Sequence, residues 1–522
     1  MAESRDVEAV GAAPPPEESP AEAPRGRRPI EWWEIGAVVA VVLLAAALRM
    51  YGLATKSFWV DEIKAVIVSG SLQQSLIETG FGHEPPLRYF LLHYLIRLNP
   101  PELWARLPSY LLGVASVPLL WLLGRRLFGV GAAVTAAFLL ALSPWHIVES
   151  QDARMYTVML FFWLLSLVCF LAALERPKQG LLWVALAVVH AVNFYLSYLT
   201  IFVLAAEALV LIVWLVVRVL REGRRFAKKP YAIGALIFAG FFGFLVSFWS
   251  PYLIQLYQSY VYPEPPSGPI ALPPNVRQVP WPAQFDSKFL IQFFDQLLIP
   301  GPPWRLAAFL GLVMGLWLCW RRNWPFALIG LLSFAIAMAA ILLTGMRHFV
   351  APRYLFHMLL FAVTAYAVVF ATIGEHVLAR APKGAPRALA AAVLAAIALG
   401  LLYIAAPVIQ LHVKAERQYW KQAVAFLTAR MQPDEALIIG PWETDWAMLY
   451  YGRQFLEGKR PVFYANSIER TESALAQSGG RAWFIIWGYL PEELARLLQE
   501  RFEPVAVFPG LKGTIHIYRA RP

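Results

Sequence analysis

Long runs of apolar residues recur along most of this 522-residue chain, and they limit what it can fold into. Hydrophobic residues make up 59% of the sequence and charged residues only 15%. A soluble protein cannot bury so large a share of apolar surface, because the buried fraction rises only slowly with chain length. A bilayer can solvate that surface, and a spanning helix needs about 20 largely apolar residues. The sequence therefore predicts a polytopic α-helical membrane protein.

The apolar runs predict about eleven membrane spans, placed first by length and then by the bias of Lys and Arg toward the cytoplasmic side. The expected spans are 33–48, 104–123, 130–148, 156–174, two within 181–218, 231–253, 304–320, 325–343, 354–373 and 388–406. The strongly basic connectors then all fall on one side. This agreement predicts a cytoplasmic N-terminus in the cell membrane. It also makes the net charge of +11 a topology signal and not a surface for nucleic acid.

Three regions of different character follow from this pattern. Residues 1–30 are rich in Pro, Ala and Glu and are expected to form a disordered cytoplasmic tail, and residues 31–406 a membrane domain. Residues 407–522 alternate short helical and strand patterns, which predicts a small extracytoplasmic α/β domain without a nucleotide loop. Its expected helices are 415–430, 444–451, 468–477 and 491–501, and its strands 436–440, 461–465, 482–487, 504–508 and 514–519. The apolar segment 85–98 is too short to span, and we expect a helix on the outer membrane surface.

An acidic pair, Asp61-Glu62, lies in the first outward loop. Acidic residues at the start of a helix often only complement its dipole. Here Phe58 and Trp59 flank the pair and favour a carboxylate packed against apolar groups, which could act as a general base for a hydroxyl. Lys64 lies three residues after Asp61 and would share its helix face.

A second acidic loop contains Glu149, Asp152, Arg154 and Tyr156. One interpretation is a charge cluster at the membrane surface, with Asp152 paired to Arg154. The other is that both outward loops bring a carboxylate to one cavity, with either Glu149 or Asp152 as the second acidic residue. Spacing alone does not decide between them.

Two further polar groups are expected on the outer side. His83-Glu84 precedes the interfacial segment, and a metal held by these residues with Asp61 and Asp152 is conceivable. No tight ligand motif supports one, so we predict no metal and no cofactor. The later loop carries Arg347, His348 and Arg353, whose outward position runs against the usual charge bias. They could bind a lipid-carried phosphate or simply ordinary lipid headgroups.

Polar residues within the predicted spans are His190, Asn193, Glu207 and His357. Charged groups at that depth are costly and often functional. We expect Glu207 to pair with His190 in a structural role.

These segments, in their order and spacing, resemble the GT-C superfamily of membrane glycosyltransferases, in particular its protein O-mannosyltransferase and aminoarabinose transferase branch. The resemblance is carried by Phe58–Glu62, His83–Phe90, Arg106–Ser109 with Gly124–Gly129, Asp152–Tyr156, and Pro352-Arg353-Tyr354. It implies an inverting, metal-independent transferase that uses a polyprenyl-phosphate sugar donor on the extracytoplasmic face. By resemblance, Asp61 is the catalytic base, Asp152 the second acidic residue, and Arg353 with Arg347 the phosphate-binding group. The residues expected to bind substrate are Glu62, Lys64, His83, Glu84, Arg154, Tyr156, Arg347, His348 and Arg353.

The expected partners are the lipid-linked sugar donor, membrane lipids, and an acceptor that could be lipid, glycan or protein. A transporter or flippase is the main alternative, but it would favour inverted repeats with broken helices, which are not visible. A scaffold that only presents the C-terminal domain would not need Asp61 or Asp152.

Overall fold

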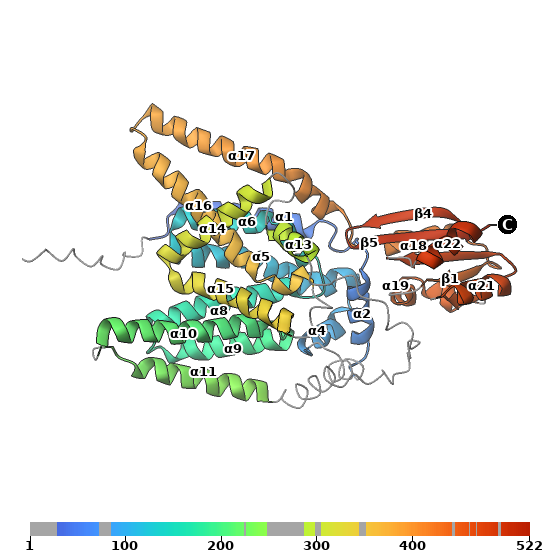
Figure 1. Ribbon diagram of the computed structural model, residues 1–522, viewed down its shortest axis with the longest axis horizontal. Coiled ribbons are helices and arrows are strands. Elements are labelled where there is room, and N and C mark those ends of the chain that lie inside the picture. The colour runs from blue at the N-terminus through green and yellow to red at the C-terminus, as the bar shows by residue number, and fades with distance from the viewer. Residues whose placement is uncertain are drawn as a thin grey trace, which may run out of the picture.

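The computed structural model describes residues 29–72, 85–223, 226–247, 287–297, 304–343, 351–440, 444–458, 460–465, 467–488 and 492–521. Helices form an elongated bundle, and a smaller sheet-containing part projects from one end of it (Figure 1). His83, Glu84, Arg347 and His348 lie outside the described residues.

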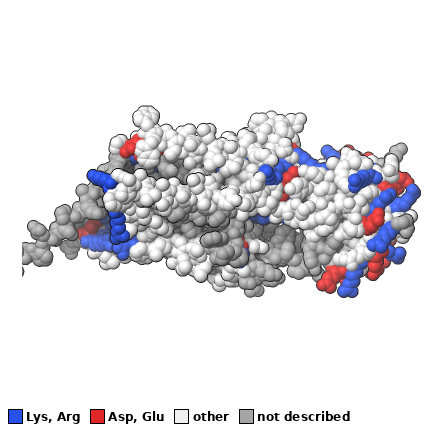
Figure 2. Space-filling model, turned by 90° about the horizontal axis from the view of Figure 1, so that it is seen from above, with Lys and Arg blue, Asp and Glu red and all other residues white. Residues whose placement is uncertain are grey.

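A helix lies at each of the predicted spans. The helices are α1 (Trp32–Met50), α5 (Pro101–Phe128), α6 (Val130–Leu142), α7 (Pro144–Ser150), α8 (Tyr156–Glu175), α9 (Gly180–Leu196), α10 (Thr200–Glu222), α11 (Lys229–Ser247), α14 (Trp304–Arg322), α15 (Trp324–Leu343), α16 (Met358–Arg380) and α17 (Ala385–Lys414). Of the helices that the structure describes, seven are long and apolar enough to cross a membrane, or eight if α6 and α7 form one bent span. On the face shown in Figure 2, charged side chains gather toward the two ends and leave a broad uncharged belt between them, as expected for a bundle surrounded by lipid.

The predicted span over 130–148 is bent in the structure. The chain bends by 59° between α6 and α7, where Ser143 is followed by Pro144. A proline cannot continue the helical hydrogen bonds, but it suits the first turn of a new helix, which the Ser143 hydroxyl caps by accepting from the His146 N–H at 3.3 Å. The fully buried Arg49 donates to the carbonyl oxygens of Leu140 and Ala141 at 3.0 and 2.9 Å. It thereby satisfies acceptors that the break would leave open.

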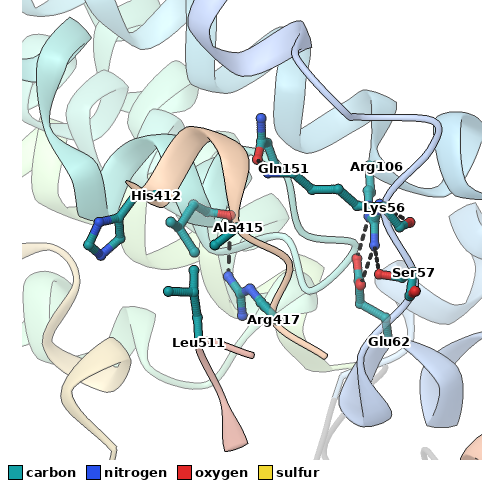
Figure 3. Close-up of a pocket in the computed structure, with 10 residues that line it drawn as sticks. Lys56, Ser57, Glu62, Arg106, Gln151, His412, Ala415, Arg417 and Leu511 are labelled. Carbon is teal, nitrogen blue, oxygen red and sulfur yellow. Dashed lines mark hydrogen bonds and ion pairs between the residues drawn. The ribbon is translucent and has the colours of Figure 1, made fainter. Parts of the chain in front are cut away.

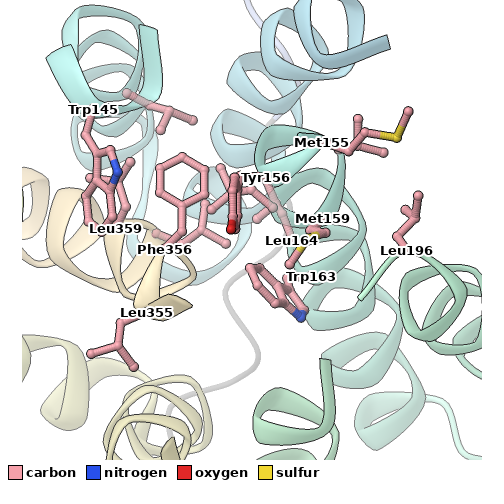
Figure 4. Packing of buried hydrophobic residues seen from close by; sticks show 14 of the residues in the cluster. Trp145, Met155, Tyr156, Met159, Trp163, Leu164, Leu196, Leu355, Phe356 and Leu359 are labelled. Carbon is pink, nitrogen blue, oxygen red and sulfur yellow. The ribbon is translucent and has the colours of Figure 1, made fainter. Parts of the chain in front are cut away.

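Short helices occupy the end of the bundle that faces the sheet. They are α2 (Val60–Ser69), α4 (Leu87–Leu95), α13 (Ser287–Leu297) and the 3₁₀ helix η4 (Pro352–Leu355). The predicted helix in segment 85–98 is therefore present as α4, which packs on α2, α5 and α9. Below η4, Trp145 packs edge-on against Phe356 with ring centres 4.9 Å apart, in an aromatic core that also contains Tyr156 and Trp163 (Figure 4). This core gives the short elements a rigid base.

The C-terminal part contains a five-stranded sheet in the order β2-β1-β3-β5-β4. Its elements are α18 (Trp420–Arg430), β1 (Ala436–Ile439), α19 (Thr444–Tyr451), α20 (Arg453–Leu456), β2 (Val462–Tyr464), α21 (Ile468–Gln477), β3 (Ala482–Trp487), α22 (Glu492–Arg501), β4 (Phe502–Gly510) and β5 (Gly513–Ala520). Strand β1 is parallel to β2 and β3, whereas β5 is antiparallel to β3 and β4.

The predicted helix 415–430 begins later than expected, at Trp420. Helix α17 continues to Lys414, and the residues between the two helices, 415–419, are not helical. Glu416, Arg417 and Gln418 in this connection are buried. They meet the first loop and the second acidic loop, so tertiary contacts override the local helical pattern here.

Candidate active site

Asp61 lies in the first turn of α2, where three separate segments converge. Its Oδ2 atom is 2.7 Å from Nη1 of Arg154, which precedes α8, and 3.0 Å from Nη2 of Arg353, which lies in η4. The Asp61 side chain retains 11% of its exposure. Burial by itself raises the pKa of Asp61, but Arg154, Arg353 and Lys64 outweigh it and lower the pKa to about 2. Asp61 is therefore an ionised carboxylate held between two guanidinium groups.

Glu62, the next residue, has a different environment. Its side chain is 1% exposed and takes two hydrogen bonds from Arg106 of α5, from Nε at 2.8 Å and Nη2 at 2.7 Å (Figure 3). The backbone N–H groups of Ala153 and Trp59 donate to the same carboxylate at 2.8 and 3.2 Å. Burial raises the pKa of the Glu62 carboxyl, and the Arg106 guanidinium opposes that rise. Since both carboxylate oxygens are taken by donors of this chain, Glu62 holds the site together.

Arg106 also binds the backbone of the first loop to α5. Besides Glu62, its guanidinium donates to the carbonyl oxygens of Leu53, Lys56 and Ser57 at 3.1, 3.0 and 2.8 Å. All five N–H donors of the guanidinium are thus used. The first loop is fixed to the bundle by one buried ion pair and its associated carbonyl contacts.

The second acidic loop supplies Asp152 and Glu149, which are 0% and 3% exposed. Both contact Arg417 from the connection between α17 and α18, Asp152 at 2.7 Å and Glu149 at 3.2 Å. The indole N–H of Trp59 also donates to Asp152 at 3.3 Å. The interpretation with Asp152 paired to the guanidinium of Arg154 is not what the structure shows. Arg154 donates to Asp152 through its backbone N–H at 3.0 Å, whereas its side chain reaches Asp61.

A left-handed residue makes this divergence possible. Met155, 1% exposed, has φ of 59° and precedes the first residue of α8. Such a conformation is uncommon for a non-glycine residue and costs about 1–3 kcal/mol, so the surrounding contacts must impose it. It places Ala153 against Glu62 and Arg154 against Asp61 on one side of the turn, and starts α8 at Tyr156 on the other.

Trp59 lies between the two acidic groups and is flanked by two cations. The guanidinium carbons of Arg353 and Arg417 lie 5.1 and 4.8 Å from its ring centre. Cations over an indole face are favourable, most strongly where water is excluded. The aromatic residue that the sequence placed beside the acidic pair therefore orders the cations that surround it.

A small cavity of about 20 Å³, room for about one water molecule, lies beside the Glu62–Arg106 pair (Figure 3). Lys56 lines it and donates from Nζ to the side chain of Gln151 at 2.8 Å and to the carbonyl oxygen of Val413 at 2.6 Å. Leu511, from the turn between β4 and β5, lines the opposite wall. The bundle and the C-terminal sheet thus enclose this space together.

The structure brings together most of the predicted site residues that it describes. Asp61, Asp152, Glu149, Arg154 and Arg353 form one charged cluster. The ring centre of Tyr156 lies 5.8 Å from the guanidinium carbon of Arg353. The Lys64 ammonium instead lies 6.0 Å from the ring centre of Trp446 in α19. Arg417 was not predicted, and Arg106 was identified only through its motif. The signal for Arg417 was the group of charged residues Lys414, Glu416 and Arg417 that follows the last apolar run, and such a group resembles ordinary charges at a membrane border.

Within the bundle, the predicted pairing of His190 with Glu207 is present. Nε2 of His190 lies 2.7 Å from one Glu207 oxygen, and Ser166 donates to the other at 2.9 Å. Among the described residues, no group of three or more His, Cys, Asp or Glu is placed to hold a metal ion.

Solved structures of membrane enzymes share the fold of this chain over most of its length. The apo structure of ArnT from Cupriavidus metallidurans aligns over 92% of this chain and 98% of its own, with a TM-score of 0.51 and 16% identity. The archaeal oligosaccharyltransferase AglB from Archaeoglobus fulgidus aligns over 87% of this chain and 69% of its own, with a TM-score of 0.53 and 13% identity. At such identities the likeness is one of fold.

Sequence comparisons point the same way. Residues 83–249 match the family model described as dolichyl-phosphate-mannose-protein mannosyltransferase. YycA of Bacillus subtilis (strain 168), named as a candidate mannosyltransferase, is 27% identical over 162 residues, which cover 29% of this chain and 24% of that protein. The matched stretch thus spans about a quarter of the curated relative. The structural matches confirm the predicted fold class, a multi-pass helical membrane protein of the GT-C type, and the sequence matches are to a mannosyltransferase family model and a relative named as a mannosyltransferase.

Proposed function

We propose that this protein transfers a sugar from a polyprenyl-phosphate carrier to an acceptor hydroxyl, with inversion, on the extracytoplasmic side of the membrane. The observation that carries the proposal is the Asp61 carboxylate with two guanidinium groups at 2.7 and 3.0 Å. A base beside fixed positive charge is what attack on a phosphate-linked sugar requires. AglB, which shares the fold, has been solved in complex with a dolichol-phosphate, which supports a lipid-linked donor.

The proposed reaction uses Asp61 as the general base. Asp61 takes the proton of the acceptor hydroxyl while the hydroxyl oxygen attacks the anomeric carbon of the sugar. The bond from that carbon to the phosphate oxygen breaks at the same time. The polyprenyl phosphate leaves with the bonding electrons, and Arg353 and Arg154 stabilise its charge. The new glycosidic bond lies on the face opposite to the departing phosphate, which inverts the configuration.

The two arginines also explain how a carboxylate with so low a pKa can serve as a base. With its pKa lowered to about 2, Asp61 accepts a proton poorly while both guanidinium groups face it. A bound donor phosphate competes for those same groups. As they turn toward the phosphate, the pKa of Asp61 rises toward its ordinary value, so the base is activated only when the donor is in place.

The other acidic residues take supporting roles in this proposal. Glu62 positions the first loop through Arg106, and Asp152 with Glu149 orients Arg417. The proposed orientation puts the N-terminus in the cytoplasm and the sheet domain outside. The basic connectors of the sequence support it, because Lys and Arg are favoured on the cytoplasmic side.

Replacing Asp61 by asparagine tests the proposal. In purified full-length protein, we expect transfer from polyprenyl-phosphate mannose into acceptors from a membrane extract to fall by roughly 10²–10⁴-fold. Binding of polyprenyl phosphate should persist, because an uncharged amide at this position no longer competes for the two arginines. The matched control is Asp434→Asn, a half-exposed carboxylate paired with Arg481 in the C-terminal part.

Thermal unfolding of both variants shows whether the fold is intact. Transfer by a folded Asp61→Asn protein at the wild-type rate would contradict the catalytic assignment. Movement of the lipid-linked sugar across a vesicle membrane without any glycosylated product would favour a transporter instead.

A further inference from the structure

The turn between β4 and β5 reaches from the C-terminal sheet to the charged cluster. Strand β4 ends at Gly510 and β5 begins at Gly513, so Leu511 and Lys512 form the tip. The backbone N–H of Leu511 donates to the Glu416 carbonyl oxygen at 3.0 Å, and that of Lys512 to the Arg417 carbonyl oxygen at 2.9 Å. The tip is therefore joined by backbone hydrogen bonds to the residue that holds Asp152 and Glu149.

Glycine is required at both ends of this turn. A Cβ atom on Gly510 would lie 2.3 Å from the carbonyl oxygen of Arg417, closer than atoms can approach. Gly513 has φ of +117°, which side-chain-bearing residues rarely adopt. These two positions let the hairpin lie directly against the connection that follows α17, and they set where Lys512 is placed.

Lys512 shares the electrostatic environment of the site. Desolvation by the surrounding protein, with Arg353 and Arg417 adding to it, lowers the pKa of Lys512 to about 8, while Glu149 and Asp61 oppose the change. The Lys512 side chain is exposed, so a ligand can reach it. At neutral pH most of the Lys512 side chains carry a charge.

The charges of the cluster do not balance. Arg154 and Arg353 share Asp61, and Arg417 contacts Asp152 and Glu149. Within the described part of the chain, the Lys512 ammonium has no carboxylate or hydrogen-bond partner. Among the described residues, three arginines contact the carboxylates of Asp61, Asp152 and Glu149, and Lys512 adds a further positive charge beside them. An accessible ammonium without a partner in the described residues, beside other cations, can bind an anion through charge-assisted hydrogen bonds.

We propose that Lys512 binds the phosphate of the lipid-linked donor, so that the C-terminal domain supplies part of the donor site. This inference rests on the proposed function and extends it to a residue far from the membrane domain in the sequence. The Lys512 ammonium contacts a phosphate oxygen from the side of the hairpin, while Arg353 and Arg154 approach from the bundle. The donor is then held between the two parts of the molecule.

Direct binding of undecaprenyl phosphate to full-length protein in nanodiscs, without acceptor, tests this role. We expect Lys512→Met to weaken binding by about 10- to 100-fold, the usual effect of losing one charge-assisted hydrogen bond. Lys512→Arg should restore most of the affinity. Lys414→Met is the matched control, because Lys414 is an exposed lysine in the last turn of α17.

A second variant tests the placement without removing the lysine. Gly510→Ala should push the tip away from Arg417 and weaken binding in the same direction. In turnover assays, Lys512→Met should raise the donor KM and leave kcat nearly unchanged, because the contact is made in the bound state as well as during reaction.

Inorganic phosphate and phosphatidylglycerol vesicles serve as competitors. Displacement of undecaprenyl phosphate by phosphatidylglycerol at equal concentration would show a general headgroup site and overturn the assignment to the donor. Unchanged affinity of a folded Lys512→Met protein would also overturn it, even if Asp61→Asn abolishes transfer. Conversely, weak binding by Lys512→Met together with normal transfer by Asp61→Asn would refute the proposed chemistry and leave the phosphate site standing.

Discussion

Two groups of buried charges in this protein differ in how their partners are matched. Inside the bundle, the Glu207 carboxylate lies 2.7 Å from Nε2 of His190 and accepts a hydrogen bond from the Ser166 hydroxyl at 2.9 Å. Both partners lie on neighbouring helices. At the end of the bundle, Asp61 faces two arginines, and the surrounding cluster has more cations than carboxylates. The first group has its partners within the chain, whereas the second has capacity left for a negatively charged ligand.

The comparison extends to the adjacent residues Asp61 and Glu62. Glu62 is 1% exposed and bonded through both oxygens, and Asp61 is 11% exposed and contacted at one oxygen. Of these two adjacent residues, Glu62 therefore resembles the fully partnered charges inside the bundle, and Asp61 does not. A carboxylate whose oxygens are all occupied stabilises the fold, and one contacted at a single oxygen can take part in chemistry.

The largest expected effect is the loss of folding stability caused by Glu62→Gln. Glu62→Gln leaves the Arg106 charge buried without a carboxylate, which should lower the free energy of unfolding by about 3–5 kcal/mol. Thermal unfolding in detergent should show a reduced midpoint, with activity and folded protein lost together. If Glu62→Gln instead remained as stable as Asp61→Asn and lost only activity, the division between the two residues would fail.

A smaller effect, on binding, is expected from Arg353→Gln. Loss of one guanidinium from the proposed phosphate site should raise the donor KM by about 10- to 100-fold, equivalent to about 1.5–3 kcal/mol. Steady-state kinetics at two salt concentrations measure it, and Arg496→Gln on the exposed surface of α22 is the control. An unchanged KM would show that Arg353 stabilises the fold and does not bind the donor phosphate.

The smallest effect is expected inside the bundle. Glu207→Gln keeps a hydrogen-bonding group toward Ser166 and His190, so we expect a loss of about 1 kcal/mol, in the range of polar contacts between membrane helices. Transfer activity per folded molecule should be unchanged. A loss of turnover comparable to that of Asp61→Asn would show that the membrane pair belongs to the functional machinery.

Much of the fold follows from local pattern. The apolar strand Ala482–Trp487 and the helices around it were placed almost residue by residue, because strand and helix periodicities alternate clearly there. The break after α6 was missed, although Pro144 marks it. Prolines 108 and 118 lie inside α5 without ending it, so a proline in an apolar run does not identify a break by itself.

The site was predicted in part. The carboxylates and Arg353 were recognised from motifs, but their partners depend on long-range contacts. Arg106 is 44 residues from Glu62, and Arg417 meets Asp152 only after the whole bundle has formed. Such long-range contacts cannot be predicted from the spacing of residues in the sequence. An arginine at a membrane border also has the same local pattern whether it sets topology or binds a carboxylate.

The connection that holds Arg417 has a consequence for biosynthesis. A ribosome releases Asp61, Glu149 and Asp152 early, and proteins made this way generally fold from their N-terminal side. Until residue 417 and the hairpin at Lys512 have emerged, the two carboxylates of the second loop have no cation and the wall formed by Leu511 is missing. A chain still under synthesis therefore carries Asp61, the proposed base, without the groups that complete the site, and only the nearly finished protein can assemble it.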